Sequence, residues 1–322
     1  MSEVETIKKM LEYKRPAGSK AEAAFIHEFI TPLGAKRDAF GNQVLVVGDE
    51  NPAWLWSSHT DSVHTKHGKQ IVAQTGKFLH LPEKSRSNCL GADDAAGVWV
   101  MSEMIKAKVP GLYVFHAAEE IGCKGSRAIA TKQPDFLANI TAAIAFDRRG
   151  VDSVITHQGS RCCSDNFGKS LAAQLPKRFK LDPTGVLTDT KMYMKIVPEC
   201  TNISVGYYSE HSENERLDVD HLIELRDHMV SIDPTSFVIE RDPKLEPPAP
   251  KYKGGTSSKI LQQLSLLRER REESIYDLVY WHPKIVAELL QDAGITYEDL
   301  KDHIEASGTP AFDYGDYEPI VA

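Results

Sequence analysis

Long hydrophobic runs are missing from this 322-residue chain. No apolar stretch approaches the roughly 20 residues that a membrane-spanning helix needs, so we expect neither an integral membrane protein nor a membrane partner. Residues Met1 to Lys14 mix acidic and basic side chains and contain no apolar core of the kind found in secretory signals. We therefore expect a cytoplasmic protein.

Cysteine is scarce as well. The chain has five cysteines, which is an odd number and a small one for 322 residues. No two of them have the C-x-x-C spacing of redox or metal-binding motifs. A disulfide framework of the small secreted kind is therefore excluded. Cys162 and Cys163 are adjacent, and we expect them to be reduced and structural.

An excess of basic charge is also absent. The chain has 38 basic and 46 acidic residues and a net charge of −8, which argues against nucleic acid as a partner because phosphate binding depends on basic surfaces. The charge is uneven, since six basic and thirteen acidic residues lie between Thr256 and Ala322. Most of the negative charge thus belongs to the last part of the chain.

Residues Arg241 to Gly255 (RDPKLEPPAPKYKGG) concentrate proline, lysine and glycine, as linkers do. We predict a main domain over residues 1–241, a linker over 242–255, and an acidic helical unit with a flexible tail over 256–322. Apolar residues at helical spacing and a Thr296–Asp299 capping box support the helices. The helix expected after Thr296 carries Glu298, Asp299, Asp302 and Glu305, which argues against DNA binding. We therefore expect this unit to form homo-oligomers or to bind a protein partner.

The first 241 residues alternate short apolar runs with helical patterns. This alternation predicts an α/β fold with a mostly parallel central sheet between layers of helices. The expected strands are Gln43–Val47, Ala53–Ser57, Leu112–His116, Ala142–Phe146 and Asn202–Val205. The expected helices are Lys20–Phe29, Ala95–Lys106, Asp165–Gln174 and Val219–Ile232.

Five short motifs contain histidine or carboxylate residues that could bind a metal ion. Each has an ordinary interpretation alone: a chance His-x-Asp triplet, an aspartate that caps a helix, or an exposed acidic turn. Most of the motifs, however, follow an expected strand, and ligands of open α/β sheets bind beyond the carboxyl ends of the strands. We therefore expect the motifs to meet at one edge of the sheet. Their candidate metal ligands are His59, Asp93, one of the adjacent Glu119 and Glu120, Asp147 and His211.

This set of ligands has the chemistry of a zinc site. Three carboxylates come close to balancing two divalent cations, and two imidazoles are more than magnesium would favour. A carboxylate shared by two cations roughly 3.5 to 4 Å apart is typical of two-metal hydrolases. We predict two zinc ions, and manganese or cobalt also suits these ligands.

The ordered motifs resemble those of the co-catalytic di-zinc exopeptidases: His59-x-Asp61, Gly91-Ala92-Asp93-Asp94, Glu119-Glu120-x-Gly122, Asp147, and His211-Ser212-x-x-Glu215. This superfamily includes the leucyl aminopeptidases and glutaminyl cyclases, the tetrahedral aminopeptidases, and the aminoacylase and carboxypeptidase group. The resemblance covers roughly residues 5 to 235.

The resemblance implies a role for each residue. His59 and Asp147 would hold one zinc, Glu120 and His211 the other, and Asp93 would bridge them. Glu119 would be the general base, and Asp61 would orient its neighbours. Asp93 lies only 34 positions after His59, and His211 only 64 after Asp147, so we expect neither the inserted domain of the tetrahedral enzymes nor the lid of the aminoacylase group.

The sequence leaves the substrate open. The leading hypothesis is an aminopeptidase that cleaves an amide bond of a peptide. Arg148, Arg149 and Arg161 offer guanidinium groups that grip carboxylates bidentately, which would favour a carboxypeptidase or an N-acyl amino acid hydrolase. The alternative is that these arginines balance the acidic site or face solvent. A further alternative is a non-catalytic binding protein with the same fold. The presence of Glu119 argues against it, because a protein without catalytic activity needs no base beside the metals.

Overall fold

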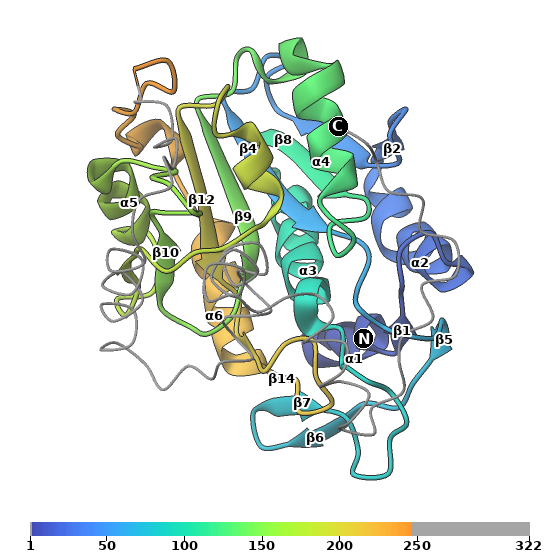
Figure 1. Ribbon diagram of the computed structural model, residues 1–322. Coiled ribbons are helices and arrows are strands. Elements are labelled where there is room, and N and C mark those ends of the chain that lie inside the picture. The colour runs from blue at the N-terminus through green and yellow to red at the C-terminus, as the bar shows by residue number, and fades with distance from the viewer. Residues whose placement is uncertain (1, 246–322) are drawn as a thin grey trace, which may run out of the picture. The chain divides into compact units, whose positions relative to one another are not determined.

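The computed structural model describes residues 2–245 of the chain, which lie within one compact unit, Met1–Pro247 (Figure 1). The predicted linker beyond residue 245 and the whole predicted C-terminal unit lie outside the described residues. Within residues 2–245, no helix combines the length and the apolar character needed to cross a bilayer.

An eight-stranded sheet forms the centre of the fold, with the strand order β11-β10-β12-β9-β4-β8-β3-β2. Its four middle strands, β12, β9, β4 and β8, run parallel, and antiparallel strands flank them on both sides. The predicted α/β fold with a mostly parallel sheet is therefore confirmed. The strands are β2 (Lys36–Arg37), β3 (Gln43–Val47), β4 (Trp54–His59), β8 (Gly111–His116), β9 (Ala142–Arg148), β10 (Ser153–Ile155), β11 (Lys180–Asp182) and β12 (Glu199–Ser204).

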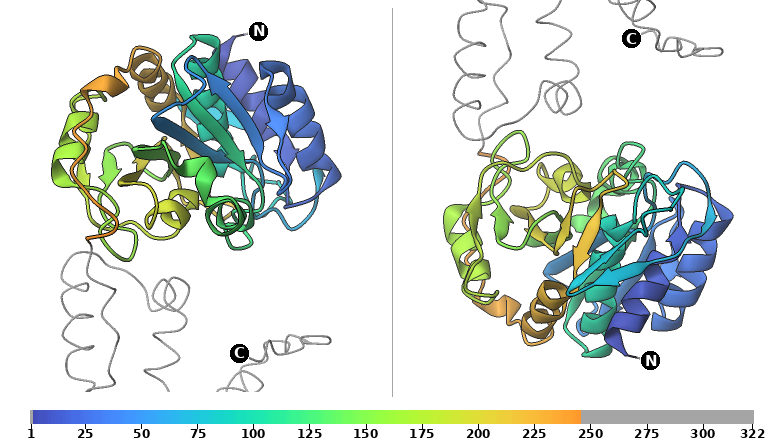
Figure 2. Two further views of the ribbon diagram at one scale, coloured as in Figure 1. Left: turned by 90° about the horizontal axis from the view of Figure 1, so that it is seen from above. Right: turned by 90° about the horizontal axis from the view of Figure 1, so that it is seen from below.

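Helices cover both faces of this sheet (Figures 1 and 2). Alternate strand residues face opposite sides: Trp56 and Tyr113 belong to one buried cluster, and Leu55 and Val114 belong to the other. This is the pattern of a sheet buried on both faces. One face is covered by α1 (Glu3–Leu11), α2 (Lys20–Phe25), α3 (Ala92–Lys106), α5 (Asp165–Ala172) and α6 (Val219–Met229), and the other by α4 (Lys124–Lys132) and the 3-10 helix η4 (Asp189–Tyr193).

Helix α3 lies so close to β9 that only glycine fits at position 97. A Cβ atom at Gly97 would lie 2.3 Å from the carbonyl oxygen of Phe146 and 2.6 Å from both Asp94 carboxylate oxygens. This glycine therefore allows helix α3, whose first turn contains Asp93 and Asp94, to pack directly against the strand that carries Asp147.

The predicted elements differ from the observed ones mainly at their ends. Helix α2 ends at Phe25 and continues as a π-helix, η1 (Ile26–Ile30), followed by the 3-10 helix η2 (Thr31–Leu33). Helix α3 begins three residues earlier than expected, at Ala92. The sequence analysis did not identify α1, α4, the short edge strands or the 3-10 helices η3 (Pro134–Leu137) and η5 (Pro234–Ser236).

Two small sheets complete the described fold. One has four strands in the order β13-β14-β7-β6, and the other pairs β1 with β5. Between His59 and Asp93 the chain makes only β5, β6 and β7, each of two or three residues, so no inserted domain is present there. The strands are β1 (Tyr13–Lys14), β5 (Gly68–Lys69), β6 (Ala73–Thr75), β7 (Phe78–His80), β13 (Tyr207–Tyr208) and β14 (Arg216–Asp218).

Candidate metal centre

The five predicted ligands lie together at the carboxyl edge of the parallel strands. His59 is the last residue of β4, Asp147 lies near the end of β9, and Glu120 lies in the turn after β8. Asp93 lies in the first turn of α3, where its φ and ψ angles are not helical. His211 follows β13 in a loop and has a φ of 63°.

The ligand atoms form two groups that share Asp93. His59, Asp93 and Asp147 make one group, and Asp93, Glu120 and His211 make the other; within each group the atoms lie within 4.8 Å of one another. Asp93 Oδ1 lies 2.9 Å from His59 Nε2, whereas Asp93 Oδ2 lies 3.2 Å from His211 Nε2. The two oxygens of one carboxylate thus face two different imidazoles.

Asp61 is hydrogen-bonded to residues of both ligand groups. Its carbonyl oxygen lies 3.2 Å from His59 Nδ1, so this nitrogen carries the proton in the neutral ring and Nε2 offers its lone pair to the site. Its carboxylate accepts hydrogen bonds from the backbone N–H groups of Glu119 and Glu120 at 3.0 and 3.2 Å. Asp61 therefore orients the His59 ring and fixes the turn that carries both glutamates.

Burial and mutual repulsion control the ionisation of the carboxyl groups. Burial, followed by the nearby charge of Asp93, raises the pKa values of Glu120 and Asp147. Burial also opposes ionisation of Asp93, but hydrogen bonds to His211 and His59 outweigh it and lower the pKa of Asp93. Several buried carboxylates at one place are costly unless cations compensate them.

Two residues that the sequence analysis did not identify hold Asp147 in place. The Thr188 hydroxyl donates to Asp147 Oδ2 at 2.7 Å, and the Tyr207 hydroxyl donates to Asp147 Oδ1 at 3.0 Å. Both lie far from Asp147 in the sequence, in segments without a motif that would have indicated this contact.

The Glu119 carboxyl group lies outside both ligand groups. It accepts a hydrogen bond from the Cys123 thiol at 3.3 Å, and burial raises its pKa well above the usual range. Glu119 and Glu120 are thus held by the same turn but have different surroundings.

The three arginines proposed to bind a substrate carboxylate have partners within the chain. Arg148 contacts Asp182 at 3.5 Å, Arg149 contacts Glu210 at 3.3 Å, and Arg161 contacts Asp165 at 2.7 Å. Arg148 directly follows the predicted ligand Asp147, and Arg149 contacts Glu210, the residue before His211.

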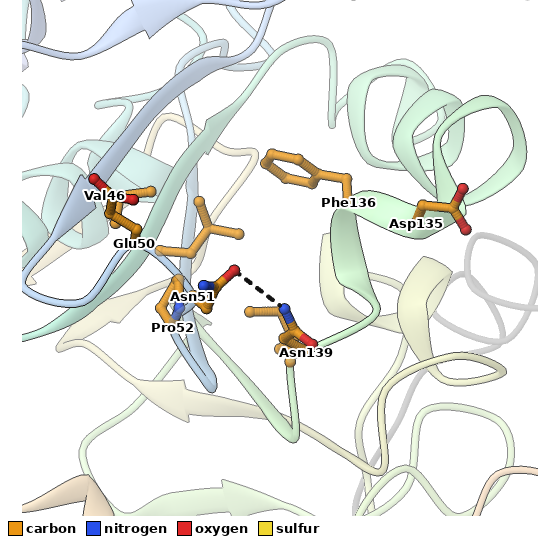
Figure 3. A pocket seen from close by; sticks show the side chains of 9 residues that line it. Val46, Glu50, Asn51, Pro52, Asp135, Phe136 and Asn139 are labelled. Carbon is orange, nitrogen blue, oxygen red and sulfur yellow. Dashed lines mark hydrogen bonds between the residues drawn. The ribbon is translucent and has the colours of Figure 1, made fainter.

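A surface pocket of about 200 Å³ lies away from these ligands (Figure 3). It is lined by residues such as Val46, Leu112, Phe136 and Ile140. Leu112 is the second residue of β8, and Ile140 precedes β9, so the pocket lies at the edge of the sheet opposite the candidate metal centre. It contains none of the predicted site residues.

Residues 44–180, which include four of the five predicted ligands, match the family model described as peptidase family M28. Solved structures with the same architecture include the Pyrococcus horikoshii TET1 peptidase (TM-score 0.54, 16% identity, 71% of this chain and 98% of that one). A tripeptidase from Staphylococcus aureus (TM-score 0.57, 15% identity) and the aminopeptidase PepT from Bacillus cereus (TM-score 0.54, 14% identity) each cover 71% of this chain and 96% of their own.

The chain has the zinc exopeptidase fold. The resemblance inferred from the motifs is confirmed, and so is the prediction of a metallopeptidase. A comparison with curated protein sequences finds no match. The similarity to the solved structures defines the fold. The match of residues 44–180 to a peptidase family indicates that the functional class is peptidase.

Proposed function

We propose that this protein is an aminopeptidase that uses two zinc ions held by His59, Asp93, Glu120, Asp147 and His211. The observation that carries the proposal is the orientation of Asp93, whose two oxygens face the imidazoles of two separate ligand groups. If Asp93 only capped α3, its oxygens would be expected to face backbone N–H groups of the helix and not two histidines.

The donor set fits zinc. Each group offers one imidazole nitrogen and two carboxylates, one of them shared, and imidazole with carboxylate is a common ligand combination for zinc. Glu120 Oε1 is buried and has no hydrogen-bond partner among the described residues, as expected for an oxygen that a cation would satisfy. When bound, the two ions would polarise the scissile carbonyl and lower the pKa of water.

In this proposal the residues around Glu119 serve to move the proton. Glu119 accepts a proton from the attacking water and returns it to the leaving amine. Asp61 keeps Glu119 beside the ligands through the backbone hydrogen bond to its N–H. The Cys123 thiol donates a hydrogen bond to Glu119 Oε1.

The partners of the arginines favour an aminopeptidase over a carboxylate-recognising enzyme. A guanidinium that binds a substrate carboxylate should be free of internal acids, and Arg148, Arg149 and Arg161 each contact one. Arg149 would have to leave Glu210 to bind a carboxypeptidase or N-acyl amino acid substrate.

A substrate panel tests this proposal. Purified protein reconstituted with zinc would be assayed with aminoacyl anilides, free-carboxylate dipeptides and N-acyl amino acids. We expect hydrolysis of the anilides and no requirement for a free carboxylate. Activity confined to N-acyl amino acids would favour the alternative, and stoichiometric zinc without any hydrolysis would favour a binding protein.

Assembly and location are separate parts of the proposal. The TET1 peptidase of Pyrococcus horikoshii can assemble into a tetrahedron or a large octahedral shell. We propose that the present chain also self-associates or binds a partner, through its acidic C-terminal unit, and that it acts on peptides in the cytoplasm.

A further inference from the structure

We infer that Glu215 and Arg15 form a buried clamp that fixes the backbone around Asp93 and so sets the spacing of the two metal sites. The inference rests on the proposed two-metal function and adds two positioning residues to it. Neither side chain belongs to the ligand groups. Both act through the backbone of the segment that ends at Asp93.

Glu215 holds this segment from one side. Its side chain is buried, with 1% of the residue exposed. Oε2 accepts hydrogen bonds from the N–H groups of Leu90 and Gly91 at 2.7 and 2.8 Å, and Oε1 accepts one from the N–H of Asp93 at 3.0 Å. Three backbone donors on one carboxylate define the position of the peptide that carries the shared ligand.

Arg15 holds the same segment from another side. It is completely buried, and its Nη2 donates to the Gly91 carbonyl at 3.1 Å while its Nε donates to the Thr60 carbonyl at 3.0 Å. Thr60 directly follows His59. One guanidinium therefore joins the segment that carries the first imidazole to the segment that carries Asp93.

The space around Gly91 shows how closely the clamp fits. Gly91 has a φ of 76°, and a Cβ atom there would lie 2.8 Å from His64 Cε1 and 3.3 Å from Arg15 Nη1. A residue with a Cβ atom could therefore take this position only if the His64 ring and the Arg15 guanidinium moved. Because Glu215 lies four positions after His211, the clamp also connects Asp93 to the loop of the second imidazole.

A positioning role predicts an effect on metal binding that a merely stabilising role would not produce. Glu199 offers a matched control because it is a completely buried glutamate that also accepts three backbone N–H hydrogen bonds, from Ser164, Glu240 and Arg241. It lies at the start of β12, whereas the metal ligands lie at the opposite edge of the sheet.

The experiment compares Glu215→Gln with Glu199→Gln. Zinc affinity would be measured by competition with a chromophoric chelator, coordination by the absorption spectrum of bound cobalt, and folding by thermal unfolding. We expect both variants to unfold at lower temperature. Only Glu215→Gln should weaken zinc binding, by about 10-fold to 100-fold, as is typical when a group that orients a ligand is lost, and only this variant should change the cobalt spectrum.

Unchanged zinc affinity and an unchanged cobalt spectrum in Glu215→Gln would overturn the clamp while leaving the proposed function intact. Wild-type protein that binds no zinc, manganese or cobalt would overturn the proposed function and the clamp together. If Glu215→Gln does not fold, Arg15→Lys provides the test, because lysine keeps the charge but cannot donate to both carbonyls in the geometry of a guanidinium. Wild-type zinc affinity in folded Arg15→Lys would likewise refute the clamp.

Discussion

Replacing Glu119 by glutamine should nearly abolish catalysis while leaving the metal content unchanged. The amide has the shape of the carboxylate but cannot accept the proton of the attacking water. The substitution should not disturb the fold, because Asp61 holds residue 119 through the backbone N–H, which the variant retains.

The size of the effect follows from the role of a general base. Positioned acid–base groups typically contribute about 100-fold to 10,000-fold in rate, which corresponds to about 3 to 5 kcal/mol of activation free energy. Metal affinity should be unchanged, because the Glu119 carboxylate belongs to neither ligand group. The assay is the turnover of an aminoacyl anilide, with metal content measured by elemental analysis.

Glu120→Gln is the matched control one residue away. Glu120 Oε2 lies 3.1 Å from His211 Nε2, within the second ligand group, so this variant should lose one metal ion. If Glu119→Gln loses metal while Glu120→Gln keeps it, the two roles have been assigned the wrong way round. Near-normal turnover of metal-replete Glu119→Gln would refute the reasoning entirely.

Three further predictions follow from burial and anchoring. Chelation should remove the metal at His211 before the metal at His59, because the His211 side chain is 23% exposed and the His59 side chain only 1%. Elemental analysis of His211→Ala should show one retained metal. Burial lowers the pKa of His221 to about 4, so His221 takes up a proton in the unfolded state first as the pH falls below 6.5. The free energy of unfolding should therefore decrease by up to about 3 kcal/mol by pH 4. A His221→Gln variant that keeps the same pH dependence of thermal unfolding would contradict this. A chain ending at Asp242 should fold and bind two metals, because Arg241 still donates hydrogen bonds to the carbonyls of Met194, Val197 and Pro198. Light scattering of this shortened chain would show whether the removed unit controls the oligomeric state.

The parallel strands were predictable because their apolar runs are long enough to stand out. Strand β3 matches its prediction at both ends, and β4, β8 and β9 differ from theirs by one or two residues. The two- and three-residue strands were not predictable, because so short a segment has no measurable periodicity. Helix α2 was predicted too long because its apolar pattern continues through the π-helical turn at Ile26–Ile30.

The closeness of the candidate ligands was predictable for a different reason: histidines and carboxylates at strand ends meet at one edge of a parallel sheet. Side chains that act through long-range contacts gave no such signal. Arg15 lies in a segment without a motif, and its two carbonyl partners are 45 and 76 positions away. Glu215 belongs to a motif of the resemblance, but only the structure gives its three backbone donors.

The most direct test of the two-metal proposal is anomalous diffraction from crystals of the zinc-reconstituted protein. We predict two zinc peaks per chain, roughly 3.5 to 4 Å apart, one beside His59 and Asp147 and the other beside Glu120 and His211, with Asp93 between them. A single peak, or a peak away from Asp93 in a protein with all five side chains intact, would contradict the account.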